Sequence, residues 1–335
     1  MPEGHPRVTV GVPVFDGESF LAETLESLLN QTYSNFEVVV SDNASTDRTE
    51  QICRDYASRD PRIRYYRSDL NRGAGWNHNR VFELARGEYF KWNSADDLCA
   101  PEFLAQCVAA LDRDPNAVMV MTNAVYIDQR GARLGSTDVW GNTLLPIVPS
   151  AARPHVRFRC NIQMNHLCVT IYSLIRSQVL RQTELIGNYP EADRNLLAHL
   201  ALFGHCIIVP EVLFFNRDHP GRYSRVLQDD YFCGLREQMI WYDPTKRTRK
   251  MFPFFQKCLE LCRIVARTRI GPWERIGCYC ALMQWLFKKE NILRFYDDAT
   301  YYPRKYVVRR FPWAKIAWNW LWGKGKVQGP SRNPS

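Results

Sequence analysis

A regular alternation of strand and helix patterns over residues 7–127 is the feature that most constrains the fold of this chain. Short β-branched apolar runs are each followed by apolar residues at helical spacing. The expected strands cover residues 7–15, 36–41, 62–67, 88–93 and 117–127, and the expected helices cover 19–30, 47–56, 77–86 and a stretch opened by Pro101. This order predicts an α/β fold with a doubly wound, mostly parallel sheet.

Beyond residue 127 the pattern is less regular. Residues 128–190 contain several Pro and Gly breaks, residues 193–203 have helical periodicity, and residues 206–216 predict one or two strands. From about residue 235 the chain has the pattern of helices rich in Arg and aromatic residues. We therefore expect an α/β domain over residues 1–235 and a helical, basic and aromatic C-terminal extension over residues 236–335.

The charge of the chain is divided in the same way. Its formal net charge of +9 combines a net −6 over residues 1–245, a net +14 over residues 246–326 and one further charge from Arg332. Within this basic stretch, Trp and Tyr side chains are interleaved with Lys and Arg, which is typical of proteins at a bilayer interface. Peripheral attachment to an anionic membrane is one hypothesis for the extension, and a helical cap packed on the catalytic domain is the other. No RNA-binding module is recognisable, so we expect no nucleic-acid partner.

Cysteine usage and hydropathy indicate the compartment. The 11 cysteines are odd in number and form no CxxC pair, which argues against a disulfide framework or a zinc site. The N-terminal residues lack the apolar core of a signal peptide, and the longest weakly polar stretch, 276–287, is shorter than the roughly 20 residues that span a bilayer. We expect a cytoplasmic protein, with the inner face of the plasma membrane as the site of any peripheral attachment.

Acidic side chains follow two of the expected strands. Asp42 ends the second strand region, and Asp96 and Asp97 follow the fourth. The carboxyl ends of parallel strands share one edge of the sheet, where ligands bind, and paired carboxylates there suit a hard divalent cation. The simpler alternative is that Asp96 and Asp97 only cap the helix near Pro101. The glycine-rich dinucleotide fingerprint does not follow the first strand, and no P-loop motif is present. Gly73-Ala74-Gly75 follows the third strand but is not expected to lead directly into a helix.

Four ordered motifs resemble those of the family 2 glycosyltransferases of GT-A fold, over roughly residues 7–225. The motifs are VPVFDGESFLAETLESLLNQTYSNFEVVVSDNASTDRT, NRGAGWNHNRVFELARGEYFKWNSADDLCAPEFL, EADRNLLAHLALFG and VPEVLFFNRDHPGRYS. The resemblance implies that the first loop, the second strand end and the loop before residue 74 hold the donor nucleotide. The residues it assigns to this role are Pro13, Val14, Phe15, Glu18, Asp42, Asn71, Arg72 and Gly73. For Arg72, a solvated loop charge is an equal alternative.

The resemblance also implies a divalent cation, Mg²⁺ or Mn²⁺. The family's Asp-x-Asp motif corresponds to Ser94-Ala95-Asp96, so the first acidic position is a serine here. Asp96 would bind the cation against the diphosphate, Asp97 would support the metal shell or the sugar, and His219 would complete the shell or touch phosphate. Arg217 and Arg222, in the same segment as His219, would contact the diphosphate.

The base of the inverting members is an Asp at the start of a helix. Asp193 takes this position, with Glu191 as the fallback because Ala192 replaces the usual preceding Glu. Asp193 could alternatively serve only as a helix N-cap.

The expected activity is inverting, metal-dependent transfer of a sugar from a nucleoside diphosphate donor, UDP-linked as a first choice, to a hydroxyl acceptor that is a glycan, a lipid-linked saccharide or a secondary metabolite. The substitutions at Ser94 and Ala192 leave a second hypothesis, a catalytically reduced module that binds nucleotide-sugar or scaffolds a membrane assembly. A nucleotidyltransferase is disfavoured, because residues 12–17 do not supply a Gly-rich basic loop.

Overall fold

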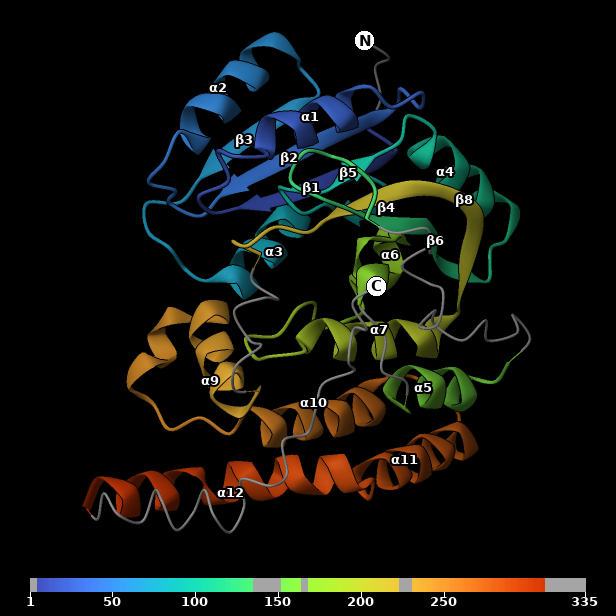
Figure 1. The fold of residues 1–335 in the computed structure, drawn as a ribbon. Helices are drawn as coiled ribbons and strands as arrows, with labels where there is room; N and C mark the ends of the chain where they lie inside the picture. The colour runs from blue at the N-terminus through green and yellow to red at the C-terminus, as the bar shows by residue number, and fades with distance from the viewer. Residues whose placement is uncertain (1–4, 135–151, 164–167, 223–230, 311–335) are drawn as a thin grey trace.

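The computed structural model describes residues 5–134, 152–163, 168–222 and 231–310 (Figure 1). Within these ranges eight strands form one sheet in the order β3-β2-β1-β4-β7-β6-β8-β5. The strands are β1 (Val8–Val14), β2 (Phe36–Asp42), β3 (Ile63–Arg67), β4 (Tyr89–Trp92), β5 (Leu98–Cys99), β6 (Ala117–Ile127), β7 (Leu174–Arg176) and β8 (His205–Arg217). Strands β1 to β4 pair in parallel, as do β6 and β8, whereas β7 and β5 pair antiparallel to their neighbours. The sheet is therefore mixed but mostly parallel, which confirms the expected fold class.

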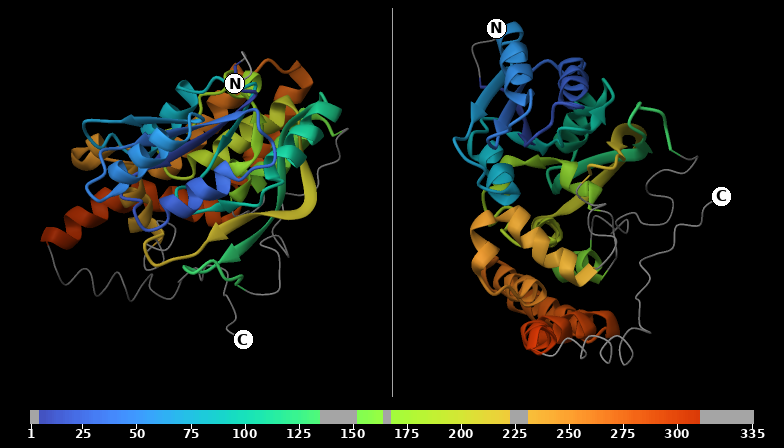
Figure 2. Two further views of the ribbon diagram at one scale, coloured as in Figure 1. Left: turned by 90° about the horizontal axis from the view of Figure 1, so that it is seen from above. Right: turned by 60° about the vertical axis from the view of Figure 1, so that its left-hand side comes forward.

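Helices cover both faces of this sheet (Figure 1). The α-helices are α1 (Leu21–Leu29), α2 (Thr49–Arg59), α3 (Ala74–Glu83), α4 (Phe103–Arg113), α5 (Pro154–Gln163), α6 (Ser177–Leu180), α7 (Ala192–Phe203), α9 (Tyr231–Tyr242), α10 (Pro253–Arg267), α11 (Pro272–Leu286) and α12 (Lys289–Arg310), and the short 3₁₀ turns are η1 (Val169–Tyr172) and η2 (Pro244–Thr248). Helices α1, α2 and α4 lie on one face, whereas α3, α6 and α7 lie on the other. The C-terminal helices α10 to α12 stack beyond α7, farthest from the sheet (Figure 2).

Apolar periodicity explains why these elements form and how they pack. Strands β1 and β2 bury nearly every side chain because helices cover both of their faces. Leu21, Leu25 and Leu28 recur at helical spacing on α1 and are all buried in the cluster between α1, α2, α4 and the sheet. Burial of each such side chain stabilises the fold by about 1.5–3 kcal/mol. The alternation of strands and helices thus gives one apolar cluster on each face of the sheet, and loops connect the ends of the strands.

Three features of the sequence prediction differ from the structure. Helix α3 begins at Ala74, directly after Gly73, whereas we expected a start at residue 77. Gly73 has a φ of +90°, a conformation that glycine adopts freely, so the chain turns sharply into the helix there. The same helix ends at Glu83, not at Gly87. Helices α5 and α6 and strands β5 and β7 were not predicted, because most of these segments are only two to four residues long.

The C-terminal helices pack on the α/β region through a third apolar cluster. Leu261 of α10 and Cys278 of α11 meet Ala198 and Leu202 of α7 and Phe158 of α5. The expected boundary after residue 235 falls inside α9, which runs from Tyr231 to Tyr242, so the two-domain division remains a proposal. Over the described ranges no helix has both the length and the apolar character to cross a bilayer. The ten cysteines whose side chains the structure describes are free thiols.

His199 makes the contact between α7 and α10 sensitive to acid. The buried ring lies 3.0 Å from the Thr268 hydroxyl, and burial lowers the pKa of His199 to about 4 from an ordinary 6.5. The unfolded chain therefore binds a proton at this position before the folded chain does, so stability is lost as the pH falls from about 6.5 to about 4. We expect this loss to be on the order of 3 kcal/mol, and His199→Gln to remove it. Urea unfolding of both proteins across this pH range measures the difference, with His5→Gln as an exposed control. Equal pH dependence in wild type and His199→Gln would contradict the assignment.

Candidate active site

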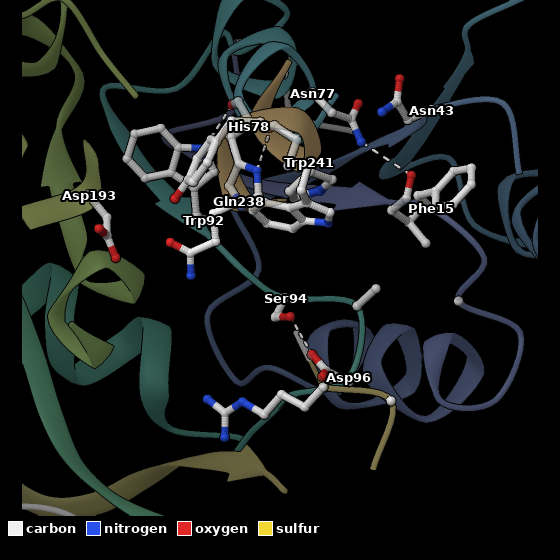
Figure 3. Close-up of a pocket in the computed structure, with 18 of the residues that line it drawn as sticks. Phe15, Asn43, Asn77, His78, Trp92, Ser94, Asp96, Asp193, Gln238 and Trp241 are labelled. Atoms are coloured by element: carbon white, nitrogen blue, oxygen red, sulfur yellow. Dashed lines mark hydrogen bonds between the residues drawn. The ribbon is translucent and has the colours of Figure 1, made fainter. Parts of the chain in front are cut away.

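A cavity of about 1140 Å³ opens at the carboxyl edge of the sheet (Figure 3). Its walls come from the loops after β1, β2 and β4, from α3 and α7, and from α9. This edge is where ligands bind in open α/β sheets, and the volume suffices for a nucleotide-sugar. The sequence-predicted residues that line it are Pro13, Val14, Phe15, Asn71, Asp96, Asp97, Glu191, Asp193, His219 and Arg222.

The loop after β1 forms one wall of the cavity. Phe15 is 46% exposed on this wall, and Asn43, from the loop after β2, lies beside it (Figure 3). Asn77 of α3 holds the two strand ends together, because its Nδ2 donates to the Val14 carbonyl at 3.2 Å and to the Ser41 carbonyl at 2.9 Å. Asn77 thus ties the end of β1, which leads into the Phe15 loop, to the end of β2.

Asp42 does not line the cavity, contrary to expectation. Its fully buried carboxylate accepts hydrogen bonds from the Tyr65 hydroxyl at 2.8 Å, from Arg67 Nη1 at 2.5 Å and from the Ser45 amide at 2.8 Å. These protein donors occupy the lone pairs that a nucleoside would need. Asp42 therefore shapes the turn beneath the cavity, and the neighbouring Asn43 reaches it instead.

Glu18 also faces away from the cavity. Its carboxylate accepts from the Arg48 amide at 3.0 Å and from Arg48 Nε at 3.2 Å. Glu18 is not among the residues that line the cavity, because its carboxylate binds Arg48, the residue just before α2. The ribose contact therefore stays a prediction. The side chains around it that do line the cavity are Asp16, Ser19 and Phe20.

The loop before α3 brings only one of its three predicted residues to the cavity. Asn71 lines it, and its Oδ1 accepts from Asn43 Nδ2 and from the Gly73 amide, both at 2.9 Å. Arg72 is exposed and stacks on Trp76, with 5.1 Å from its guanidinium carbon to the ring centroid. Gly73 allows close packing, because a Cβ at this position would lie 2.3 Å from the Tyr242 carbonyl at the end of α9.

Asp96 and His219 form a polar pair on the cavity wall. His219 Nε2 lies 2.9 Å from Asp96 Oδ2, and the hydroxyl of Ser94 donates to Asp96 Oδ1. Burial would raise the pKa of Asp96, but the hydrogen bonds from His219 and Ser94 outweigh it and lower that pKa below its usual value. Ser94, which stands where the family motif has its first Asp, therefore supports the remaining carboxylate (Figure 3).

Asp97 holds the loop rather than offering a free carboxylate. Its side chain is 1% exposed and accepts from Asn216 Nδ2 and from the Arg217 amide, at distances of 2.8–3.1 Å. Burial and the neighbouring charge of Asp96 raise the pKa of Asp97 to about 7. The loop after β4 is thus tied to the end of β8.

Arg217 is fully buried and does not line the cavity, so the structure does not bring it to the expected diphosphate site. Its Nη2 donates to Glu23 Oε2 at 2.6 Å, its Nε to the Asp96 carbonyl at 2.9 Å and its Nη1 to the Gln129 carbonyl at 2.9 Å. Arg222, five residues on, does line the cavity. Burial would lower the pKa of Arg222, but the charges of Asp97 and Asp96 help to raise it. The guanidinium of Arg222 is therefore a cation close to these two aspartates.

Asp193 lies on another wall of the same cavity, on the first turn of α7 (Figure 3). Its Oδ1 accepts from the Arg194 amide at 2.9 Å. Glu191, the fallback base, also lines the cavity, but its carboxylate binds Lys257 Nζ at 2.7 Å. Burial opposes ionisation of Glu191, yet Lys257, Arg294 and Arg194 outweigh it and lower its pKa far below the usual value. A carboxylate so stabilised is a poor proton acceptor, which leaves Asp193 as the better candidate.

The cavity residues that were not predicted include His78, Trp92, Trp241 and Tyr242. His78 Nδ1 lies 2.9 Å from the Ala74 carbonyl, and the indole of Trp92 donates to the His78 carbonyl at 2.8 Å. Because we expected α3 to begin three residues later, its first turn was not assigned to the sheet edge. The sequence signal that could have placed the start of α3 earlier is Gly73, since a glycine can turn the chain directly into a helix. Trp241 and Tyr242 lie on α9, which reaches the cavity only through tertiary packing, and no local pattern marks them.

Comparison with known proteins gives the class of this chain. The model of the family described as "Glycosyl transferase family 2" matches residues 9–180, and the chain belongs to this family. Its structural neighbours include the Staphylococcus aureus TarS 1–349 fragment in complex with UDP-GlcNAc, with a TM-score of 0.51 at 15% identity over 89% of this chain and 92% of that one. This likeness shows a GT-A type fold, as expected.

Relatives in sequence cover different parts of the chain. An uncharacterized glycosyltransferase of Haemophilus influenzae is 26% identical over 251 residues, which are 72% of this chain and 75% of that protein. EpsE of Bacillus subtilis is 33% identical over 145 residues, 43% of this chain and 50% of EpsE. Chondroitin synthase of Escherichia coli is 30% identical over 135 residues, 40% of this chain and 20% of that enzyme. The chain thus matches half or less of the length of two of these three relatives.

Proposed function

We propose that this protein is an inverting glycosyltransferase that moves a sugar from a nucleoside diphosphate donor to a hydroxyl acceptor. The observation that carries the proposal is that one cavity holds two separated carboxylates with different surroundings. Asp193 stands at the start of α7, whereas Asp96 stands after β4 beside His219 and Arg222. Inverting transfer needs such a division, because the acceptor is deprotonated on one side of the sugar and the diphosphate leaves on the other.

The donor nucleotide would occupy the wall formed by the loops after β1 and β2. Phe15 offers an aromatic face for the base, and Asn43 and Asn71 offer amide groups for the base or ribose. UDP is the first nucleotide to test, since the TarS fragment was solved with UDP-GlcNAc. Arg222 would contact the diphosphate, because it is the predicted Arg that lines the cavity.

A divalent cation fits the pair of Asp96 and His219. A carboxylate oxygen and an imidazole nitrogen lie 2.9 Å apart on the cavity wall, and a cation between them would replace their hydrogen bond. The described ranges hold no group of three or more His, Cys, Asp or Glu side chains placed for a metal ion. The remaining positions would therefore be filled by diphosphate oxygens and water, as is common for Mg²⁺. When bound, the cation would neutralise charge on the departing diphosphate.

Asp193 would take the proton of the acceptor hydroxyl as the oxygen attacks the anomeric carbon. Its carboxylate is held by the Arg194 amide, and no ion pair comparable to that between Glu191 and Lys257 stabilises it in the described contacts. A carboxylate within reach of the acceptor hydroxyl can take its proton in the transition state. The acceptor would enter beside α9, where Gln238 and Trp241 line the cavity.

A catalytically reduced module that binds nucleotide-sugar, or scaffolds a glycan assembly, is the second candidate. The replacement of the first motif Asp by Ser94 and of the preceding Glu by Ala192 favours it. We further propose a cytoplasmic enzyme that acts on a glycan, lipid-linked or secondary-metabolite acceptor, with a peripheral membrane contact through its basic C-terminal extension.

A thermal-shift screen of nucleoside diphosphates with Mn²⁺ or Mg²⁺ tests the donor site. A ligand at 100 times its Kd stabilises the folded state by about 2.7 kcal/mol, so we expect UDP with the cation to raise the Tm more than either alone. Hydrolysis of the matching nucleotide-sugar then separates the two candidates. Binding without hydrolysis would favour the reduced module, and no shift with any nucleotide would contradict both.

A further inference from the structure

Helix α11 is apolar on two opposite sides. Cys278, Ala281, Leu282 and Trp285 are buried against the rest of the molecule. On the other side Trp273, Ile276, Tyr279, Met283 and Phe287, the residue just after the helix, recur at intervals of three or four and are 37–80% exposed. A helix at a protein surface normally presents polar side chains to water, so an apolar outer side indicates a partner.

The exposed apolar side of α11 continues onto its neighbours. Ile292, Phe295 and Tyr296 of α12 are 41–49% exposed, and Phe255 of α10, 51% exposed, lies with its ring centroid 6.0 Å from that of Phe295. The Tyr279 hydroxyl of α11 lies 3.5 Å from the Cys262 carbonyl of α10, so these two helices are in contact here as well. We call these exposed residues of α10, α11, Phe287 and α12 the outer helical face. The helices that carry it lie on the side of the molecule farthest from the sheet (Figure 1, Figure 2).

The charge around this face is strongly positive. Residues 246–310 contain 16 Lys and Arg but only 5 Asp and Glu. Four of the five acidic side chains are paired within the molecule: Asp297 and Asp298 with Arg236, Glu274 with His155, and Glu260 with Arg263. Arg267 pairs with Glu184, whereas the exposed side chains of Arg269 and Lys289 have no acidic partner among the described contacts.

We infer that the outer helical face docks on an anionic lipid bilayer. Trp, Tyr, Phe, Ile and Met side chains would enter the headgroup region, while Lys and Arg meet anionic headgroups. A second copy of this chain is a poorer partner, because it would bring a second positive face against the first. The inference rests on the proposed function for its context, since a peripheral transferase reaches an acceptor held at a membrane, but it depends on no catalytic residue.

Vesicle co-sedimentation of the full chain tests the inference. We expect binding to vesicles of phosphatidylcholine with phosphatidylglycerol at low salt, and much weaker binding to phosphatidylcholine alone. Trp273→Ser and Phe287→Ser remove apolar area without changing charge, so each is expected to weaken binding about tenfold and the pair on the order of 100-fold. Leu70→Ser is the matched control, because Leu70 is 55% exposed on the loop after β3.

Three results would overturn the inference. The first is wild-type protein that sediments with neither kind of vesicle at low salt. The second is a double variant that binds as well as wild type while far-UV circular dichroism shows both folded. The third is light scattering that shows self-association abolished by the double variant, without vesicle binding, which would assign the face to a second copy. Donor hydrolysis measured on the same proteins separates this outcome from failure of the proposed function, because neither Trp273 nor Phe287 lines the cavity.

Discussion

Replacing Asp193 by Asn is expected to lower turnover at least about 100-fold, because an amide cannot accept the acceptor proton. The side chain keeps its shape, and the hydrogen bond from the Arg194 amide can still be accepted by the amide oxygen, so α7 should begin as before. Donor affinity, measured by thermal shift with UDP and Mn²⁺, should change little. Nucleotide-sugar hydrolysis measures turnover even before the acceptor is known.

Two further variants give the Asp193 result its meaning. Asp55→Asn changes an exposed carboxylate on α2, far from the cavity lining, and should leave hydrolysis unchanged. Glu191→Gln should act mainly on stability, because it breaks the ion pair with Lys257. Near-normal turnover in Asp193→Asn, together with a large loss in folded Glu191→Gln, would move the base assignment to Glu191.

Replacing Asp96 by Ala is the second substitution for which we expect a loss of at least about 100-fold in turnover. It removes the carboxylate that faces His219 and the cavity, and with it the proposed cation site. Unlike Asp193→Asn, this variant should also lose the additional thermal stabilisation that Mn²⁺ gives in the presence of UDP. The two variants are thus distinguished by binding as well as by rate.

The matching control for Asp96 is its neighbour. Asp97→Asn changes a carboxylate that is bound by Asn216 and the Arg217 amide and is 1% exposed, so we expect lower stability with the cation effect retained where the protein remains folded. A cation-dependent shift that persists in Asp96→Ala would refute the role assigned to Asp96.

Local patterns in the sequence predicted much of the fold. The β-branched runs at β1, β2 and β6, the aromatic run at β4 and the leucine spacing of α1 are local patterns, so they predict a strand or a helix without knowledge of the tertiary contacts. Strand β7 has three residues and β5 has two, so their pairing is decided by neighbours distant in the sequence. The two-sided character of α11 also escaped prediction, because periodicity cannot tell which apolar side is covered.

The sequence position of a residue alone can bring it to the sheet edge. Phe15, Asp96 and Asp193 follow strands or begin a helix, and all three line the cavity. Asp42, Glu18 and Arg217 do not line it, because their charges bind protein partners up to 194 residues away in the sequence. A buried polar side chain forms hydrogen bonds with the donors or acceptors that lie beside it in the folded protein, and only the tertiary structure determines which groups these are.

By itself, the sequence determined the alternating α/β architecture, the family and the two carboxylates on which the proposed chemistry depends, because these follow from periodicity and from residue order. The tertiary structure decided which of the other charges remain available to a ligand. It assigned Arg222 rather than Arg217 to the cavity and gave Glu191 three cationic neighbours, Lys257, Arg294 and Arg194. It also placed the apolar side of α11 outward. The physical reason is that charge pairing and burial depend on contacts between segments far apart in the chain, which no local pattern encodes.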